Sequence, residues 1–344
     1  MIIYHALGFV WAFEVRDYWG ISNVVLPEGT HAFINEGGDI EIMYPCSIFP
    51  YLSFFMPWFF YKSGQFFKKR ELRALLSKDA RKLLLTFAIW SAIGYVFFLL
   101  FGILQHSLTL RSATYSVARG FFLTGKIPIN EPLWFLLTLF GVRFVAKIFL
   151  PEREDKHRWW KIGAIVLIGY LLAYVCFRWN HRLLPYWVAN SASGLAFFAL
   201  GYGLRDYENK WWLILPCAMV YVACCFIGFP MVDMMYNTSV TGNYLLWMPT
   251  ALSGIIVFNA ICMWVNRYVQ IKPLEIVGKN AMSIYVTHIL IVATCTFVVQ
   301  YFELSKCYPY MLWIYFAAYA LLLPFICYVI PKVPLLVGNT PNSE

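Results

Sequence analysis

Charged residues are scarce in this chain of 344 residues. Asp, Glu, Lys and Arg make up 13% of the sequence, whereas hydrophobic residues make up 61%. A soluble domain of this size cannot bury so much apolar surface, so the composition excludes a soluble enzyme or binding module. The sequence therefore predicts an all-α polytopic membrane protein that lies in a lipid bilayer.

Paired cysteines are also lacking. No two of the nine cysteines form a Cys-x-x-Cys pair, and most lie in apolar segments, where they are expected to act as small buried residues. This pattern favours neither a disulfide framework nor a metal site, so no metal ion is expected. The cysteines stand at positions 46, 176, 217, 224, 225, 262, 295, 307 and 327.

A basic leader is absent from the N-terminus, so a cleavable signal peptide is not expected. The chain opens directly on the apolar residues MIIYHALGFVWAF. These residues would extend only about 20 Å as a helix, whereas the hydrocarbon core is ~30 Å thick. We therefore expect residues 1–13 to be a partial first helix that has lost its cytoplasmic half.

The apolar segments predict about ten transmembrane helices in a single domain, 1–344. Internal repeats and a second domain are not visible in the sequence. The longest polar connections, 14–44 and 105–131, are expected as outer loops, the second with a short amphipathic helix around SATYSVARGFF. The expected spans are 1–13 (partial), 45–66, 83–104, 132–150, 160–178, 190–205, 211–229, 245–265, 280–302 and 309–330.

The distribution of Lys and Arg between these spans predicts the orientation of the chain. One side carries 18 basic residues and the other carries seven. Because cytoplasmic loops carry the excess of basic residues, the first side is expected to be cytoplasmic, and both termini with it. The net charge of +9 lies in short loops rather than in a basic soluble domain, so a nucleic-acid partner is not expected.

Two basic residues, Lys62 and Arg143, lie inside predicted spans. Lys62 is about five residues (~7 Å) from the cytoplasmic end of its span, so it either snorkels to the interface or binds phosphates or a carboxylate of a cytosolic ligand. Arg143 is ~10 Å deep, and arginines at such depth usually face the bundle interior with a partner. It therefore has either an anion-binding role or a structural ion pair.

Two histidines and one asparagine in predicted spans are further candidates. His5 is either an interfacial residue or a general base, because imidazole titrates near neutral pH. His288 is expected ~12 Å from the cytoplasmic side, as a hydrogen-bonded core residue or a functional one. Asn259 is expected to form a helix–helix hydrogen bond.

Lys62, Arg143 and His288 are thus expected at similar depths. If their helices cluster, they form a basic cavity that opens inward and suits an anionic cytosolic ligand. This cavity would serve either an enzyme or a transporter or flippase. A scaffolding membrane protein would not need these side chains at one depth.

Four segments of the sequence resemble motifs of the membrane acyltransferase-3 family, the polysaccharide O-acetyltransferases. They occur in the order of the family and span residues 54–288. The segments are FFMPWFFYKSG (54–64), NEPLWFLLTLF (130–140), LAFFALGYGLRDY (195–207) and VGKNAMSIYVTH (277–288).

The resemblance implies acyl transfer from cytosolic acetyl-CoA to a hydroxyl of a cell-surface polysaccharide or its lipid-linked precursor, in a bacterial inner membrane. His5 matches the histidine of an Arg–ten residues–His motif whose arginine would precede Met1, and His31 is a rival for this position. His5 and His288 are the expected catalytic residues. The expected acetyl-CoA-binding residues are Lys62, Ser63, Lys68, Lys69, Arg70 and Arg143.

Overall fold

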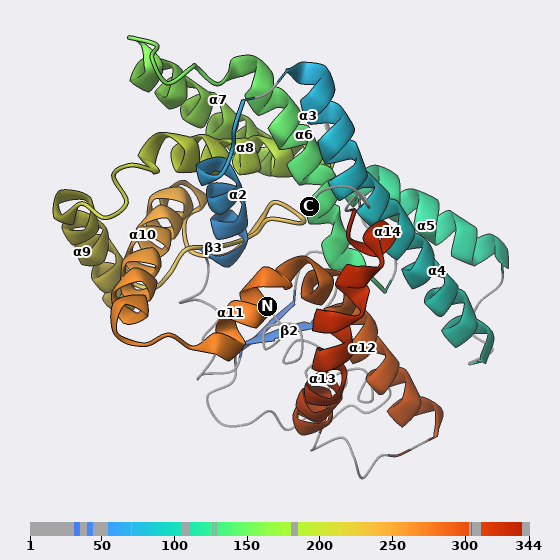
Figure 1. The fold of residues 1–344 in the computed structure, drawn as a ribbon. Coiled ribbons are helices and arrows are strands. Elements are labelled where there is room, and N and C mark those ends of the chain that lie inside the picture. Colours follow the sequence, from blue (N-terminus) through green and yellow to red (C-terminus); the bar gives the residue numbers. More distant parts are fainter. Residues whose placement is uncertain are drawn as a thin grey trace.

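Figure 1 shows the fold of the chain in a computed structural model. The structure describes residues 31–34, 40–43, 54–69, 71–104, 110–125, 127, 129–179, 185–302, 304 and 311–338. Helices dominate this part of the chain, as the apolar composition predicts.

The described helices follow one another along the chain, and most of the connections between them are short. They are α2 (Phe55–Gln65), α3 (Leu72–Asp79), the π-helix η2 (Ala80–Leu85), α4 (Thr86–Leu104), α5 (Leu110–Thr124), the 3₁₀-helix η3 (Glu131–Leu133), α6 (Trp134–Phe149), α7 (Arg158–Arg178), α8 (Tyr186–Leu204), α9 (Trp211–Ile227), α10 (Tyr244–Tyr268), α11 (Lys272–Lys279), α12 (Ala281–Tyr301), α13 (Met311–Tyr328), the 3₁₀-helix η5 (Ile330–Lys332) and α14 (Pro334–Val337).

Two short antiparallel strand pairs accompany the helices. Strand β1 (His31–Ile34) pairs with β2 (Ile40–Met43), so that His31 is opposite Met43. Strand β3 (Met231–Asp233) pairs with β4 (Thr238–Thr241) in the connection between α9 and α10. Asn237 anchors this second hairpin, because its amide donates to the Ala173 carbonyl oxygen at 2.9 Å.

Six helical segments in the described residues are long and apolar enough to cross a membrane, and each coincides with a predicted span. They are 72–104, 131–149, 158–178, 244–268, 281–299 and 313–332. Helix α9 is a shorter apolar helix at another predicted span. The chain is therefore an all-helical integral membrane protein. The total of ten spans and the location of the termini stay predictions, because residues 1–13 lie outside the described part and α2 and α8, at the spans 45–66 and 190–205, are not among the six candidates.

Helix α8 packs against α7 on one side and α2 on the other (Figure 1). Helix α8 is rich in small residues and is buried along most of its length. A Cβ atom on Gly64 of α2 would lie 2.0 Å from the Phe198 carbonyl oxygen, and one on Gly201 of α8 would lie 2.0 Å from the Tyr61 carbonyl oxygen. The two glycines thus let the backbones of α2 and α8 approach closely, as small residues do between membrane helices.

The amphipathic helix expected in the 105–131 connection is confirmed as α5. At the other end of the chain, α14 packs beside α4, where the Trp90 indole N–H donates to the Leu336 carbonyl oxygen at 2.8 Å. Gly338 then adopts a left-handed backbone with φ +65°, in contact with the backbone of η2. These contacts fix the final helical segment against η2 and α4.

Candidate functional site

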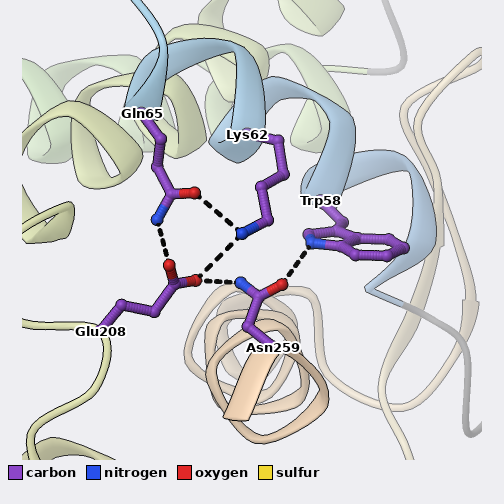
Figure 2. Close-up of polar contacts among 5 residues, drawn as sticks. All are labelled: Trp58, Lys62, Gln65, Glu208 and Asn259. Atoms are coloured by element: carbon purple, nitrogen blue, oxygen red, sulfur yellow. Dashed lines mark hydrogen bonds and ion pairs between the residues drawn. The ribbon is translucent and has the colours of Figure 1, made fainter. Parts of the chain in front are cut away.

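Lys62 belongs to a network of five polar side chains from three parts of the chain (Figure 2). Lys62 Nζ lies 3.3 Å from Glu208 Oε1 and donates to Gln65 Oε1 at 2.9 Å. Gln65 Nε2 donates to Glu208 Oε2 at 2.6 Å, and Asn259 Nδ2 donates to Glu208 Oε1. Trp58 Nε1 completes the network by donating to Asn259 Oδ1 at 3.0 Å.

The carboxylate at the centre of this network is buried, whereas the ammonium is partly open. The exposed fraction is 10% for the Glu208 side chain and 32% for that of Lys62. A buried carboxylate is costly unless hydrogen-bond donors satisfy it, and Glu208 receives three donors. Lys62 therefore does not simply extend to the interface, because its ammonium turns to an internal counter-ion.

The network also links elements that are far apart in the sequence. Trp58, Lys62 and Gln65 lie on one side of α2, Glu208 lies in the turn after α8, and Asn259 belongs to α10. The expected helix–helix hydrogen bond of Asn259 is confirmed, since it joins α10 to α2. The network thus fixes the C-terminal half of α2 against α8 and α10.

Arg143 has a carboxylate partner of its own. Its Nε donates to Asp79 Oδ2 at 2.7 Å, and the exposed side-chain fractions are 22% and 7%. The guanidinium carbon also lies 5.3 Å from the centre of the Phe67 ring, a cation–π contact just beyond the C-terminal end of α2. Of the two alternatives that the sequence left open, the structure contains the ion pair. Lys62 and Arg143 thus both lie near the C-terminal end of α2.

His288 is fully buried and faces a different set of residues. Its Nδ1 lies 2.6 Å from the Tyr285 carbonyl oxygen in the preceding turn of α12. The Tyr285 hydroxyl donates to the Pro132 carbonyl oxygen, and the Asn130 amide donates to the Val286 carbonyl oxygen at 3.1 Å. These contacts place His288 beside the beginning of α6.

The expectation that His288 and Arg143 share one depth is wrong. The second turn of α12 meets Pro132 at the start of α6, whereas Arg143 lies eleven residues later, or ~16 Å along the helix. The sequence estimate assumed that both helices cross the bilayer perpendicularly from their predicted ends. The structure instead separates two cation–carboxylate pairs, near the C-terminal end of α2, from a buried histidine beside the beginning of α6.

A chain of aromatic rings connects these two regions. The Phe60 ring of α2 lies 4.9 Å from that of Phe135 in α6, and Phe135 lies 5.9 Å from Tyr285 in α12. The Tyr285 ring in turn lies 5.9 Å from the His288 ring. Three of the four motif segments, 54–64, 130–140 and 277–288, therefore meet through this chain, and the fourth, 195–207, packs on α2 through Gly201.

The family of the protein is established by comparison with known sequences. A family model described as an acyltransferase domain matches residues 1–330. The chain belongs to the acyltransferase-3 family. No curated protein and no solved structure matches the chain. Membership in this family supports a membrane acyltransferase activity.

The remaining donor-binding candidates of this acyltransferase-3 chain lie around the end of α2. Ser63 is partly buried beside Lys62, and Lys68 is exposed in the connection to α3. Lys69 Nζ lies 3.1 Å from Glu152 Oε1, and the Glu152 side chain is 65% exposed. Arg70 lies outside the described residues. The connection and the two helical segments that follow it expose further cations, which are Arg73, Lys78, Arg81 and Lys82.

The structure does not describe the side chain of His5 or of His31, the two candidates for the histidine of the family motif. His5 lies outside the described residues, and of His31 only the backbone is described, in strand β1. The structure therefore neither brings His5 to His288 nor separates them. Within the described part of the chain, no group of three or more His, Cys, Asp or Glu side chains has a metal-binding arrangement.

Sequence reasoning missed the two carboxylates that pair with Lys62 and Arg143, the cations inside predicted spans. Asp79 and Glu208 lie in short charged connections between predicted spans, where acidic residues are usually solvated. The sequence does contain a signal for them. Asp79 precedes one predicted span and Glu208 follows another by only a few residues, and a cation within the membrane needs a partner. The partner's identity depends on which helices adjoin, which the sequence alone does not specify.

Proposed function

We propose that this protein is an integral-membrane O-acyltransferase of the bacterial inner membrane. It moves an acetyl group from cytosolic acetyl-CoA to a hydroxyl of a cell-surface polysaccharide or its lipid-linked precursor. The observation that carries the proposal is the family match over residues 1–330, whose four motif segments pack on one another around α2. Family membership supports acyl transfer, and the donor and acceptor are the proposed refinements.

Acetyl-CoA is proposed to bind where the cations gather at the C-terminal end of α2. Its phosphates would first meet the exposed basic segment 68–82 and then Lys62, with Ser63 beside it. Arg143 and Lys69 support this region, each with a carboxylate partner. Such a distribution suits a polyanionic ligand, because clustered cations raise the local concentration of anions and orient them.

The chemical step is proposed to take place further along the bundle, toward His288. His5 acts as a general base that takes the proton of the acceptor hydroxyl while the oxygen attacks the thioester carbonyl. The carbon–sulfur bond then breaks, and the thiolate of coenzyme A takes up the proton. His288 orients the site or polarises the thioester carbonyl. A donor bound on one side and an acceptor on the other thus meet within the membrane, which gives the advantage of proximity.

The test is an acetyl-transfer assay with the purified protein in lipid nanodiscs, using acetyl-CoA and the polysaccharide or lipid fraction of the host envelope. The wild-type protein should release coenzyme A and label the glycan, and His5→Ala should lower the rate at least ~100-fold, the usual contribution of a general base. Retained turnover in His5→Ala removes His5 from the mechanism. Substrate-stimulated flux across the membrane without acyl transfer would overturn the proposal in favour of a transporter.

The phosphate-binding role of Lys62 can be tested separately with two donors. S-acetylpantetheine carries the thioester but lacks the nucleotide phosphates of acetyl-CoA. Lys62→Met should raise the KM for acetyl-CoA about tenfold, the value of one charge-assisted hydrogen bond, and leave the KM for S-acetylpantetheine unchanged. An equal effect on both donors would contradict phosphate binding by Lys62.

A further inference from the structure

The exposed fraction increases across the network around Glu208, from its buried members to Lys62. Gln65, Asn259 and Glu208 are 6%, 3% and 8% exposed as residues, whereas the Lys62 side chain is 32% exposed. Of the two charged members, the cation is therefore the one that a ligand can reach. Its counter-ion lies behind it, held from both sides by amides of α2 and α10 (Figure 2).

The geometry of the ammonium leaves room for one more partner. An ammonium has three N–H donors, and the network uses two of them, toward Glu208 Oε1 and Gln65 Oε1. A lysine side chain otherwise loses much rotamer entropy when a ligand immobilises it. Because the network already holds Lys62, an anion that accepts its third proton meets a cation whose position is fixed in advance.

We infer that Glu208 is a positioning residue for donor binding, which fixes the Lys62 ammonium toward the phosphates of the acyl donor. The inference rests on the proposed function. Asn259 and Trp58 extend the same arrangement, because the indole holds the asparagine amide and the amide holds the carboxylate. Glu208 itself does not touch the donor, since it lies behind Lys62.

A purely structural role would explain the same contacts but predicts different kinetics. A carboxylate that only joins α2 to the turn after α8 affects the amount of folded protein, and the KM of the folded fraction does not change. A positioning residue changes the KM for the donor and leaves kcat nearly unchanged, because the interaction is made equally in the bound and the transition state.

The experiment compares Glu208→Gln with the wild type in nanodiscs, using steady-state acetyl transfer at varied acetyl-CoA. Glu208→Gln keeps the shape of the side chain and removes its charge. We expect the KM for acetyl-CoA to rise about tenfold with kcat within about threefold of the wild type, and the KM for S-acetylpantetheine to stay unchanged. Glu208→Asp, which retains the charge, should recover most of the wild-type KM.

The matched control is Glu275→Gln, the same substitution in another Lys–Glu pair. Glu275 Oε1 lies 2.7 Å from Lys279 Nζ on the surface of α11, with both side chains more than 60% exposed. This variant should keep both kinetic constants, because an exposed pair contributes little. A rise of the KM in Glu275→Gln as large as in Glu208→Gln would overturn the inference, because the effect would then not be specific to Lys62.

A charge exchange separates positioning from stability. The double variant Lys62→Glu with Glu208→Lys restores an ion pair between the same two elements but moves the cation to the buried position. We expect its thermal midpoint to return toward that of the wild type while the KM for acetyl-CoA stays raised. Recovery of both quantities, or an unchanged KM in Glu208→Gln, would overturn the inference. Absence of acetyl transfer in the wild type would instead overturn the proposed function.

Discussion

At the scale of single residues, the two cations inside predicted spans, Lys62 and Arg143, each have a nearby carboxylate. Arg143 pairs with Asp79, and Lys62 pairs with Glu208. A lone charge in a membrane is costly, so such cations are retained with a partner or at a functional site. Asp79 is almost fully buried, and its carboxylate therefore depends on the arginine.

Removing Arg143 should destabilise the protein strongly. Arg143→Met leaves Asp79 buried without its ion-pair partner, and breaking a buried pair from one side costs roughly 3–5 kcal/mol. We expect the thermal midpoint of the purified protein to fall markedly, and the double variant with Asp79→Leu to recover much of the loss. The measurement is thermal unfolding in detergent, followed by the fluorescence of the tryptophans.

The same double variant tests whether Arg143 also binds the donor. If it does, the KM for acetyl-CoA stays raised even after stability returns. The matched control for the stability measurement is Lys279→Met, which removes one partner of an exposed pair on α11. This substitution should lower the free energy of unfolding by less than ~1 kcal/mol. A loss in Arg143→Met no larger than in this control would show that Asp79 does not depend on Arg143.

The sequence predicts the cations of the site well and their partners poorly. Lys62 and Arg143 stand out because a charge in an apolar run is unusual whatever the fold. Glu208 and Asp79 do not stand out, because a carboxylate beside a helix end looks like any solvated loop residue. Which of these carboxylates turns inward depends on which helices are neighbours, and this is a tertiary property.

At the scale of elements, the close packing of α2 on α8 determines where the cation network lies. The Tyr61 carbonyl oxygen occupies the space that a Cβ on Gly201 would take, and the Phe198 carbonyl oxygen does the same for Gly64. Both glycines belong to segments that resemble family motifs. Their backbones must be this close for Lys62 and Gln65 of α2 to reach Glu208 just beyond α8.

Gly201→Ala should therefore separate the two helices. Its Cβ would lie 2.0 Å from a carbonyl oxygen, so the backbone must shift, and overpacking of this kind costs about 1–3 kcal/mol or more. Gly163→Ala in α7 is the matched control, because nothing lies within 4 Å of the added Cβ, and it should stabilise by up to ~1 kcal/mol. Equal thermal midpoints in the two variants would contradict the close contact.

At this scale the sequence predicts which segments form helices, but it does not predict which helices pack together. Long apolar runs with few charges specify α4, α6, α7, α10, α12 and α13, because a lipid environment requires internal backbone hydrogen bonds. The meeting of α12 with the start of α6 was not predictable, since it depends on Tyr285 and Asn130 reaching across to the other segment. The common depth inferred from residue counts failed for this reason.

At the scale of the whole molecule, the charge distribution predicts which side of the membrane holds the donor site. Helix α7 has 21 residues and is long enough, at ~31 Å, to cross the bilayer. Its first turn carries Arg158 and the exposed Lys161, after a connection that adds Arg153 and Lys156, and it ends at Arg178. The donor in the proposed function is cytosolic, so the end of α7 near Lys161 must face the cytoplasm.

Cysteine labelling at the two ends of α7 tests this orientation directly. A membrane-impermeant maleimide applied to intact cells should label Arg178→Cys but reach Lys161→Cys only after the cells are opened, because one helix cannot present both ends to the same side. The unsubstituted chain gives the background from its native cysteines, of which Cys225 and Cys262 are exposed. The reverse pattern would place segment 68–82 outside the cell, away from acetyl-CoA, and a cytosolic donor would then be excluded.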